Sequence, residues 1–342
     1  MPIVRAEDLE TLVGRIFVAR GVSEADARWI ATLLVRANLR GHDSHGVIRV
    51  PQYVAAISRG EMNPAPTIKV VSETPTTTML DGDQGFGQVV ARRGMELAIE
   101  KARAMGLSAV TLQRTNHVGR LADYVEMAAQ AGMIGLMWVN APLALVVAPW
   151  GGAARRLGTD PHAVGVPGPN GAAMVLDFAT SVVAEGKLRV KFNRKENAPP
   201  GWMIDADGRP TTDPQKFYAN PRGALLAMGE HKGYGLALVV EILAGILSGT
   251  GAARPEPGPV RNGTLMLAID PTRFLPLESF HEQVRALFEF VTSAPLAENS
   301  KGILIPGEPE ERTAEDRRAN GIFIEDETWN QILAAEASPT GG

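Results

Sequence analysis

The chain has 342 residues, of which 45% are hydrophobic and 21% are charged, as in an ordinary globular protein. A chain of this length favours two or three lobes over one. It contains no cysteine, which excludes disulfides, thiolate metal sites and a cysteine nucleophile. A net charge of −4 argues against a general nucleic-acid-binding protein.

The beginning of the chain and its longest apolar stretch bear on where the protein resides. Residues 1–8 carry acidic side chains and no apolar core, unlike a signal peptide. The apolar stretch at residues 135–150 is interrupted by Asn140, Pro142 and Pro149, and is too short to span a bilayer. We therefore expect a cytoplasmic protein with no membrane segment.

Periodicity predicts helices at both ends of the chain and alternating strands and helices between them. Two helices are expected within the first 60 residues, the second beginning at Ser23 with a capping box. Strands are expected at Thr67–Val71, Thr76–Leu80, Leu107–Leu112, Ile134–Val139, Met174–Leu176 and Thr264–Ile269. Helices are expected at Val89–Met105, Gly119–Ala131, Gly233–Leu247, His281–Val291, Thr313–Asn320 and Glu327–Glu336. This order predicts an α/β fold with helical terminal segments.

The segment from Gly41 to Tyr53 carries the strongest chemical signal. If it is one helix, His45, Arg49 and Tyr53 are each four residues apart and share a face. Alternatively, the segment is a turn that leads into a helix starting at Pro51. The three side chains supply a titratable proton donor, a forked cation for a carboxylate and a phenol. Together they are suited to hold a small acid while a proton moves, although a histidine here can also simply cap a helix.

Common nucleotide-binding and hydrolase motifs are absent from the sequence. No Gly-x-Gly-x-x-Gly fingerprint, P-loop, Gly-x-Ser-x-Gly elbow or His-Glu-x-x-His pair occurs. The histidines are scattered, without metal-ligand spacing, so we expect no metal site. A Rossmann enzyme, a P-loop ATPase and the commonest hydrolases are therefore disfavoured.

Several segments could still bind phosphate groups. The motif at residues 115–120 leads directly into a helix, whose free amides beside Arg120 could hold an anion. A strand end at residues 176–181 precedes a basic run made of Lys187, Arg189, Lys191, Arg194 and Lys195. This run could bind a ribose 2′-phosphate, although such runs usually only face solvent. His231 and Lys232 open an apolar helix, and Glu308 in a tight turn could accept ribose hydroxyls.

Seven short motifs occur in a fixed order along the chain. They are Gly41–Gly46, Thr115–Gly119, Leu157–Pro161, Asp177–Ser181, Gly208–Pro214, His231–Tyr234 and Pro306–Glu308. This order resembles the type II malate/L-lactate dehydrogenase family, and the amino-acid sequences of the motifs are closest to those of its hydroxycarboxylate dehydrogenase members. The resemblance extends from about Leu9 to about Trp329.

The resemblance implies a non-Rossmann nicotinamide-binding fold built on a mixed, largely antiparallel sheet. It also implies a homodimer with the active site near the subunit interface. We expect three units: residues 1–60 with 275–335 as a helical domain, 61–115 with 215–274 as a central sheet domain, and 116–214 as the cofactor-binding domain.

The resemblance also assigns site residues. His45 would lie beside the nicotinamide, and either His45 or His117 would transfer the proton. The expected catalytic group is Ser44, His45, Arg49, Tyr53 and His117. The expected cofactor-binding residues are His45, Gly119, Arg120, Leu121, Leu176, Asp177, Phe178, Ala179, Thr180, His231, Lys232, Asn262, Ile305, Pro306, Gly307 and Glu308. Ala141 departs from the family, which commonly has a hydroxyl residue there.

These observations predict an oxidoreductase that uses NAD or NADP to interconvert 2-oxo and 2-hydroxy carboxylic acids. One alternative is a reductase of cyclic imino acids such as piperideine-2-carboxylate, whose carboxylate and ring geometry would be similar. A second is a catalytically silent dinucleotide-binding protein, which the intact His45, Arg49 and His117 argue against. The physiological acid, the direction and the choice between NADH and NADPH stay open.

Overall fold

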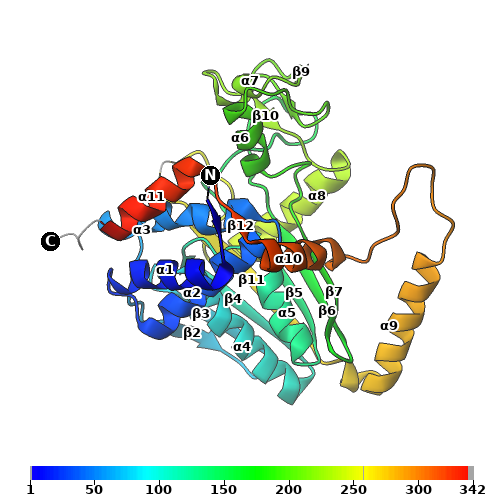
Figure 1. Ribbon diagram of the computed structural model, residues 1–342. Coiled ribbons are helices and arrows are strands. Elements are labelled where there is room, and N and C mark those ends of the chain that lie inside the picture. Colours follow the sequence, from blue (N-terminus) through cyan, green and yellow to red (C-terminus); the bar gives the residue numbers. More distant parts are fainter. Residues whose placement is uncertain (1, 257, 338–342) are drawn as a thin grey trace.

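The two ends of the chain come together in one helical layer. The computed structural model describes residues 2–256 and 258–337. From the N-terminal end come β1 (Ile3–Val4), α1 (Ala6–Val18), α2 (Glu24–Leu39) and α3 (Val50–Ser58); from the C-terminal end come α10 (Glu308–Asn320), β12 (Ile322–Phe323) and α11 (Asp326–Ala337). β1 pairs antiparallel with β12, and Phe17, Ile30 and Ile332 are buried in a shared core. Figure 1 shows this layer with the N-terminal helices in blue and α11 in red.

A seven-stranded sheet forms the centre of the molecule. In spatial order its strands are β2 (Lys69–Glu73), β3 (Thr77–Asp81), β4 (Leu107–Thr115), β11 (Asn262–Ile269), β5 (Ile134–Asn140), β6 (His162–Gly168) and β7 (Gly171–Phe178). The pair β3–β4 is parallel and the other neighbouring pairs are antiparallel. The expected mixed, largely antiparallel sheet is therefore confirmed.

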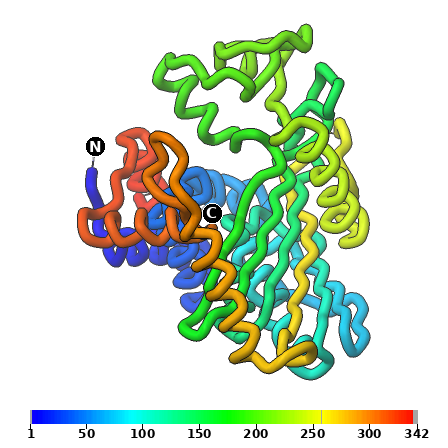
Figure 2. The backbone as a smooth tube through the Cα atoms, turned by 90° about the vertical axis from the view of Figure 1, so that its right-hand side faces the viewer, coloured from blue at the N-terminus to red at the C-terminus, as the bar shows by residue number. Residues whose placement is uncertain are grey.

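Two helices pack against this sheet through apolar side chains. α4 (Gly87–Met105) contacts β4 and β11, and α5 (Ala122–Gln130) contacts β5, β6 and β7. A Cβ at Gly165 of β6 would lie 2.3 Å from the Val125 carbonyl oxygen, so the close approach of α5 requires glycine there. α8 (His231–Val240) continues into a π-helical segment, Glu241–Ile246, which contacts β5 and β11. α9 (Leu277–Thr292) runs beside β6 (Figure 2).

A small lobe stands above the sheet (Figures 1 and 2). It contains α6 (Glu185–Asn193), α7 (Pro214–Tyr218) and a three-stranded sheet in the order β10 (Ala224–Leu225), β8 (Met203–Ile204), β9 (Pro210–Thr211). Leu188, Met203, Phe217 and Leu225 give it a core of its own. Its position lets it form one wall of a cavity.

Some expected elements differ from those observed. The continuous helix through His45, Arg49 and Tyr53 is wrong, because Asp43–His45 and Val47–Arg49 form 3₁₀ turns and α3 begins at Val50. Pro51 lies in the first turn of α3, as the alternative interpretation required. β6 and the strands of the small lobe were not expected.

The other boundaries moved by one to several residues. The helix expected from Gly119 begins at Ala122, and the one expected from Thr313 begins at Glu308. The seven-stranded sheet draws strands from both the expected sheet domain and the expected cofactor domain. In the described residues, no helix has the length and hydropathy needed to cross a bilayer.

Candidate active site

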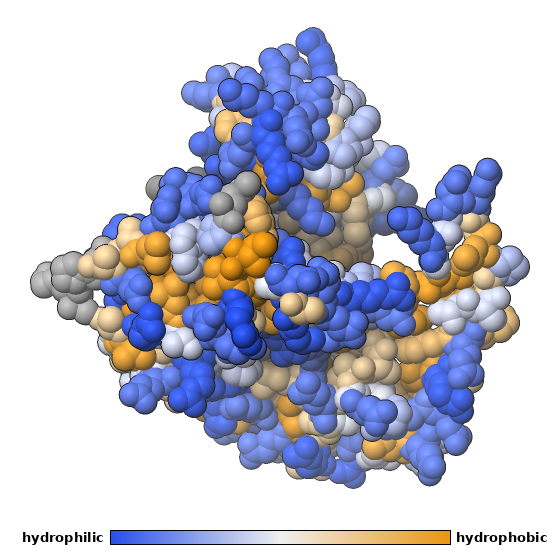
Figure 3. Space-filling model, viewed as in Figure 1, coloured by the Kyte–Doolittle hydropathy of each residue, from blue (hydrophilic) through white to orange (hydrophobic). Residues whose placement is uncertain are grey.

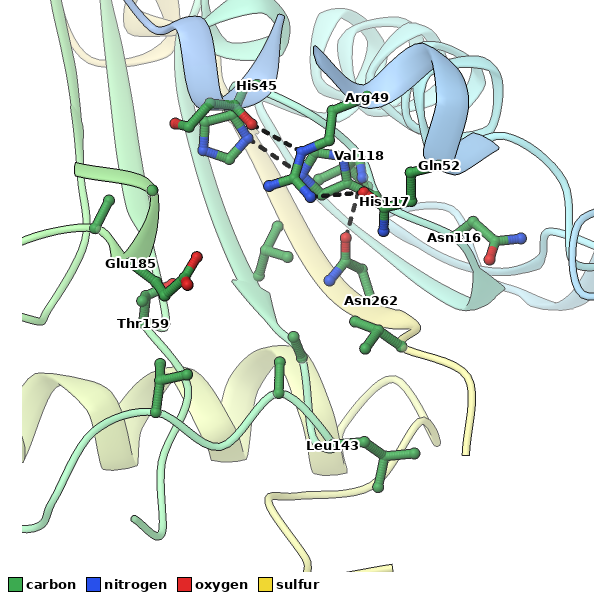
Figure 4. A pocket seen from close by; sticks show the side chains of 18 of the residues that line it. His45, Arg49, Gln52, Asn116, His117, Val118, Leu143, Thr159, Glu185 and Asn262 are labelled. Carbon is green, nitrogen blue, oxygen red and sulfur yellow. Dashed lines mark hydrogen bonds between the residues drawn. The ribbon is translucent and has the colours of Figure 1, made fainter. Parts of the chain in front are cut away.

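A cavity of about 920 Å³ lies between α3, the ends of β4, β5 and β11, and the small lobe. This volume is within the usual range of roughly 300–1,000 Å³ for small-molecule sites. Of the expected site residues, the cavity is lined by Ser44, His45, Arg49, Tyr53, His117, Gly119, Leu121 and Asn262. Figure 4 shows His45, Arg49 and His117 on one side and Glu185 of the small lobe on the other. The expected catalytic group is thus brought together although it comes from separate segments.

The turn that carries His45 is held by Asn38 of α2. The Asn38 amide oxygen accepts a hydrogen bond from the Val47 amide at 2.8 Å, and its nitrogen donates to Asp43 at 2.7 Å. A Cβ at position 46 would lie 2.1 Å from the same amide oxygen, so Gly46 is required for this contact. Arg317 of α10 adds an ion pair with Asp43 at 2.7 Å. The backbone around His45 therefore folds against the buried side chain of Asn38, which holds it in place.

A chain of hydrogen bonds connects the two histidines to the protein interior. Gln88 Nε2 donates to the Tyr53 hydroxyl at 2.9 Å, and that hydroxyl lies 2.6 Å from His117 Nδ1. His117 Nε2 lies 3.1 Å from His45 Nδ1, and the two rings are stacked with an interplanar angle of 10°. In one arrangement of the protons Tyr53 accepts from Gln88 and donates to His117, which then donates from Nε2 to His45; the reverse direction between Tyr53, His117 and His45 uses the same contacts. In the first arrangement His45 carries its proton on Nε2 and is the donor at the end of the chain.

Burial controls the proton affinity of this group. Desolvation, with Arg49 as the next contribution, lowers the pKa of His45 to about 3. The same two causes hold the pKa of His117 well below its usual value. Burial raises the pKa of Tyr53 to about 12. Without an anion beside Arg49, both imidazoles are therefore neutral at pH 7.

Arg49 is oriented by two hydrogen bonds from its guanidinium group. Its Nε donates to the Ser44 carbonyl oxygen at 2.7 Å and one terminal nitrogen donates to Gln52 Oε1 at 2.7 Å. Among residues 2–256 and 258–337, no hydrogen-bond partner is found for the other terminal nitrogen. The guanidinium edge is thus fixed and able to receive a carboxylate from the cavity.

Asn262 links the cavity floor to the histidine loop. Its side-chain oxygen accepts from the Val118 amide at 3.0 Å, and its nitrogen donates to the Asn140 carbonyl at 3.0 Å. Asn140 in turn donates to Glu241 Oε2 at 3.0 Å. Asp160, which lines the cavity, is buried against Glu241, and burial followed by the Glu241 charge raises the pKa of Asp160 well above its usual value. Asp160 therefore keeps its proton at a pH at which an ordinary aspartic acid has lost it.

The expected anion site at the start of α5 is filled by the protein itself. The Ala122 amide donates to Asp177 Oδ2 at 2.9 Å. Arg120 is buried and forms ion pairs with Asp123 at 2.9 Å and Glu126 at 3.2 Å. Burial raises the pKa of Asp177 to about 6, although the Ala122 amide favours the carboxylate. The Ala122 amide and Arg120 thus have partners within the chain, and a role for them in holding a phosphate stays a prediction.

Some of the remaining expected cofactor residues line a separate, smaller pocket, and the others have different surroundings. A pocket of about 10 Å³ is lined by Arg120, Asp177 and Gly307, with His42 and Glu310 at 3.6 Å from each other. The Pro306 carbonyl accepts from the Val175 amide, and Glu308 accepts from the Ile305 amide. Leu176 and Phe178 are in β7 and Ala179 follows them, whereas Thr180 is buried against Thr159. His231 and Lys232 are exposed at the start of α8.

Most members of the basic run after Asp177 are paired with acids. Arg189 pairs with Glu185 at 2.8 Å, Lys191 with Glu196 at 2.6 Å and Arg194 with Glu325 at 3.7 Å. Of the run, only Arg189 lines the large cavity among the described residues. Selectivity for a 2′-phosphate at this run stays a prediction.

Sequence patterns did not indicate several residues that line or support the cavity. These are Gln52, Gln88, Arg155, Asp160, Glu185, Tyr218 and Arg222. The Asp160 position lay inside the recognised motif at residues 157–161, which was a usable signal. The small-lobe residues had none, because the lobe itself was not expected. Among residues 2–256 and 258–337, no cluster of three or more His, Cys, Asp or Glu could hold a metal ion.

Comparison with known proteins agrees with this geometry. The model of the malate/L-lactate dehydrogenase family matches residues 4–333. The chain is 37% identical to hydroxycarboxylate dehydrogenase B of Escherichia coli over 335 residues, covering 96% of this chain and 92% of that one. The structure of sulfolactate dehydrogenase from Methanocaldococcus jannaschii superimposes with a TM-score of 0.88 at 38% identity, covering 98% and 96% of the two chains.

A third relative is named for a different substrate. The structure of Δ1-piperideine-2-carboxylate reductase from Pseudomonas syringae superimposes with a TM-score of 0.84 at 28% identity, covering 98% of this chain and all of that one. All three matches span nearly the whole chain, as the seven ordered motifs predicted. The protein belongs to the malate/L-lactate dehydrogenase family.

Proposed function

We propose that this protein is a nicotinamide-dependent dehydrogenase that interconverts 2-oxo and 2-hydroxy carboxylic acids. The observation that carries the proposal is the cavity in which the fixed guanidinium of Arg49 lies beside the hydrogen-bond chain ending at His45. The family supplies the reaction class, and the three relatives described above are named for acids that all carry a carboxylate beside the reacting carbon.

In this proposal Arg49 positions the substrate. The outer guanidinium nitrogens form two parallel hydrogen bonds with the substrate carboxylate, which fixes the neighbouring carbonyl carbon in the cavity. Ser44 supports this geometry through its carbonyl oxygen, which holds Arg49 Nε. Binding of the carboxylate also offsets the positive charge that, after burial, lowers the pKa of His45. Substrate binding therefore favours proton uptake by His45.

His45 then acts as the general acid. Once His45 has taken up this proton, its Nε2 proton moves to the substrate carbonyl oxygen as that oxygen gains negative charge, which leaves a 2-hydroxy acid and a neutral imidazole. His117 and Tyr53 fix the orientation and tautomer of His45 through the chain described above. In oxidation Nε2 of the neutral imidazole accepts the hydroxyl proton, with the remaining ring proton on Nδ1 facing His117. We assign proton transfer to His45 rather than His117, since both ring nitrogens of His117 are occupied by protein partners.

The cofactor fits the part of the cavity bounded by Gly119, Leu121 and Asn262. There, Asn262 and its backbone partners offer fixed polar groups, and Gly119, whose φ of 84° favours glycine, lines the cavity. A bound nicotinamide dinucleotide would supply or accept the hydride. The residues around Asp177, His231, Lys232 and Ile305–Glu308 are proposed to contact its adenosine half. NAD or NADP could serve, and we propose that both are used.

Reduction of a cyclic imino acid is the second candidate function. It is favoured by the likeness to piperideine-2-carboxylate reductase. Arg49 would bind the same carboxylate, and the proton would go to nitrogen rather than oxygen. A silent dinucleotide-binding protein is the third candidate, and the complete His45–His117–Tyr53 chain argues against it.

A turnover panel tests these candidates. The purified protein is mixed with a series of 2-oxo acids or with piperideine-2-carboxylate, each with NADH and with NADPH, and absorbance at the reduced nicotinamide band is followed. Oxidation of the cofactor by 2-oxo acids supports the main proposal, and oxidation by the imine alone supports the second. Cofactor binding without turnover on any of these compounds would support the third.

We also propose a homodimer and a cytoplasmic location. The dimer is supported by apolar side chains exposed along α8, the π-helical segment and α9, which a partner subunit would cover. Figure 3 shows such side chains gathered over α9 at the right of the molecule.

A further inference from the structure

The small lobe contributes a positively charged wall to the cavity. Arg155, Arg189 and Arg222 line it, together with one carboxylate of the same lobe, Glu185. The chain as a whole carries a net charge of −4, so this local excess of positive charge contrasts with the rest of the molecule. A cavity wall with one sign of charge concentrates ligands of the opposite sign.

One of the three arginines is already neutralised within the lobe. Arg189 donates to Glu185 Oε1 at 2.8 Å and lies over the Tyr218 ring at 4.4 Å. The Tyr218 hydroxyl donates to the same Glu185 oxygen at 2.6 Å. Arg189 and Glu185 therefore form a closed group, and the unbalanced charge belongs to Arg155 and Arg222.

Arg155 is held rigidly without an acidic partner. Its Nε donates to the Gly223 carbonyl at 2.7 Å, another nitrogen donates to the Phe217 carbonyl at 2.5 Å, and the guanidinium lies 3.8 Å above the Phe217 ring. Burial, and after it the nearby charge of Arg222, lowers the pKa of Arg155 to about 10. Two neighbouring guanidinium groups thus repel each other in a partly desolvated place.

Arg222 is the residue of this wall that most directly indicates a ligand. It is exposed to the cavity and, within residues 2–256 and 258–337, forms no hydrogen bond or ion pair with another side chain or carbonyl. The carbonyl contacts of Arg155 give that residue a structural role in joining α7 to β10. They give no reason for a second arginine beside it, whereas an anion between the two would remove their repulsion.

We propose that Arg155 and Arg222 form a second anion-binding subsite, which takes a carboxylate, sulfonate or phosphate group of the ligand in the cavity. The source favoured here is a distal acid group of the substrate, so that the enzyme prefers 2-oxo acids with a second, terminal acid group. The assignment of the anionic group to the substrate rests on the proposed function. A phosphate of the cofactor is the other group that the same two arginines could bind.

The subsite lies along a continuous wall that starts at the catalytic loop. A Cβ at Gly186 would lie 2.7 Å from Ser44 Cβ, so α6 begins directly beside the residue before His45. The wall continues through the Glu185–Arg189–Tyr218 group, and Phe217 next to Tyr218 carries Arg155. A ligand whose carboxylate is bound by Arg49 would extend along this wall toward Arg222.

The test compares acids of equal length with and without the terminal carboxylate. The substrates are 2-oxoglutarate against 2-oxopentanoate and 2-oxoadipate against 2-oxohexanoate, each measured with NADH and NADPH for the wild-type protein and Arg222→Gln. Loss of a hydrogen-bonded charge contact corresponds to roughly a ten- to hundredfold effect. We expect the ratio of kcat/KM for the diacid to that for the monoacid to fall by this factor in Arg222→Gln.

Arg209→Gln is the matched control. Arg209 is a cation of the same lobe that lies outside the cavity lining, and its side chain is 77% exposed in a 3.6 Å ion pair with Asp207. We expect this variant to keep the wild-type diacid preference. Arg222 is preferred to Arg155 for the main variant because it makes no contacts that hold the lobe.

The outcomes separate the two sources and the proposed function. A rise of similar size in the KM for NADPH or NADH, with the diacid ratio unchanged, would assign the subsite to a cofactor phosphate. No change in either quantity would overturn the subsite. If no 2-oxo acid is turned over, the proposed function fails, and calorimetric titration with adipate against hexanoate decides alone: equal affinity, or the same adipate affinity in Arg222→Gln, would overturn the subsite.

Discussion

At the residue scale, the chain Gln88–Tyr53–His117–His45 gives the two histidines different roles. His45 ends the chain at the cavity, whereas His117 has protein partners on both ring nitrogens. We expect His45→Ala to lower kcat for 2-oxo acid reduction by about 10²–10⁴-fold, the usual contribution of a general acid. His117→Ala should also lower turnover severely, because His45 then loses the group that fixes its tautomer. Circular dichroism checks that both variants fold.

Tyr53→Phe tests the contribution of Tyr53 to the hydrogen-bond chain from Gln88 to His45. It removes the hydroxyl that forms a hydrogen bond with His117 but keeps the ring that packs on Phe17 and Phe86. We expect kcat to fall by about tenfold, the value of one neutral hydrogen bond, and so less than for His45→Ala. A loss as large as that of His45→Ala would show that Tyr53 takes part directly in proton transfer.

Arg49→Lys tests the binding of the carboxylate. Lysine keeps the charge but cannot form the planar two-point contact or the bonds to Ser44 and Gln52. We expect kcat/KM for a 2-oxo acid to fall by at least tenfold, and most of the difference from wild type to disappear with the corresponding 2-oxo amide. An equal loss on acid and amide would mean that Arg49 acts on the cofactor or the fold instead.

The depressed pKa values of His45 and His117 also predict how stability depends on pH. Both are lowered in the folded chain, chiefly by burial, so the unfolded chain binds more protons below its histidine pKa of about 6.5. The two buried histidines therefore destabilise the folded chain more and more as the pH falls from about 6.5 toward 3. In urea unfolding, the wild-type free energy should decrease across this range, and His45→Gln should flatten the decrease. A variant curve parallel to the wild-type curve would contradict this cause.

At the element scale, the π-helical segment places Glu241 against Asp160 beneath the cavity. Glu241 also accepts from Asn140 and from the Ala253 amide at 2.7 Å. Because the Asp160 pKa is raised, chiefly by burial, the folded chain keeps a proton that the unfolded chain loses above its ordinary value. The free energy of unfolding therefore falls as the pH rises above the ordinary pKa of an aspartic acid toward the raised pKa of Asp160. Asp160→Asn supplies a neutral partner, and we expect its free energy of unfolding to change less with pH between 5 and 9, measured by urea denaturation.

Elements with a clear period were predictable from the sequence. The alternation of Leu107–Leu112 and Thr264–Ile269 indicated β4 and β11, and the apolar spacing with Gly106 as a stop indicated α4. β6 was missed since it alternates with His162, Gly165 and Pro167, which are poor strand formers. The two-residue strands of the small lobe carry no period at all, because their position depends on the tertiary core around Phe217.

The candidate site was predictable where it lies in short motifs. The cavity is lined as expected by Ser44, His45, Arg49, Tyr53 and His117, although the first segment forms 3₁₀ turns rather than one helix. Their supporting partners were not predictable. Gln88 reaches Tyr53 through the packing of α4, and Arg222 reaches the cavity only through the fold of the small lobe. Such contacts depend on distant segments that no local pattern connects.

At the scale of the whole molecule, the single chain leaves a long apolar surface uncovered. The exposed apolar residues of α8 and the segment after it are Leu236, Leu238, Val239, Ile242, Ile246 and Leu247, with exposed fractions between 40% and 58%. Monomers rarely expose a contiguous patch of this kind, so a second copy of the chain is the proposed cover. We expect light scattering to give twice the mass of one chain.

A charge in this surface should prevent the association. Ile242 and Ile246 are one helical turn apart and are 55% and 58% exposed, so glutamates there have little effect on the core of the single chain. We expect Ile242→Glu/Ile246→Glu to reduce the mass to that of one chain, whereas Val71→Glu, on the exposed edge strand β2, should leave the mass at two chains. A wild-type protein that is already monomeric, or a double variant that still dimerises, would refute this interface. Because the π-helical segment also carries Glu241, loss of the partner should lower turnover as well as mass.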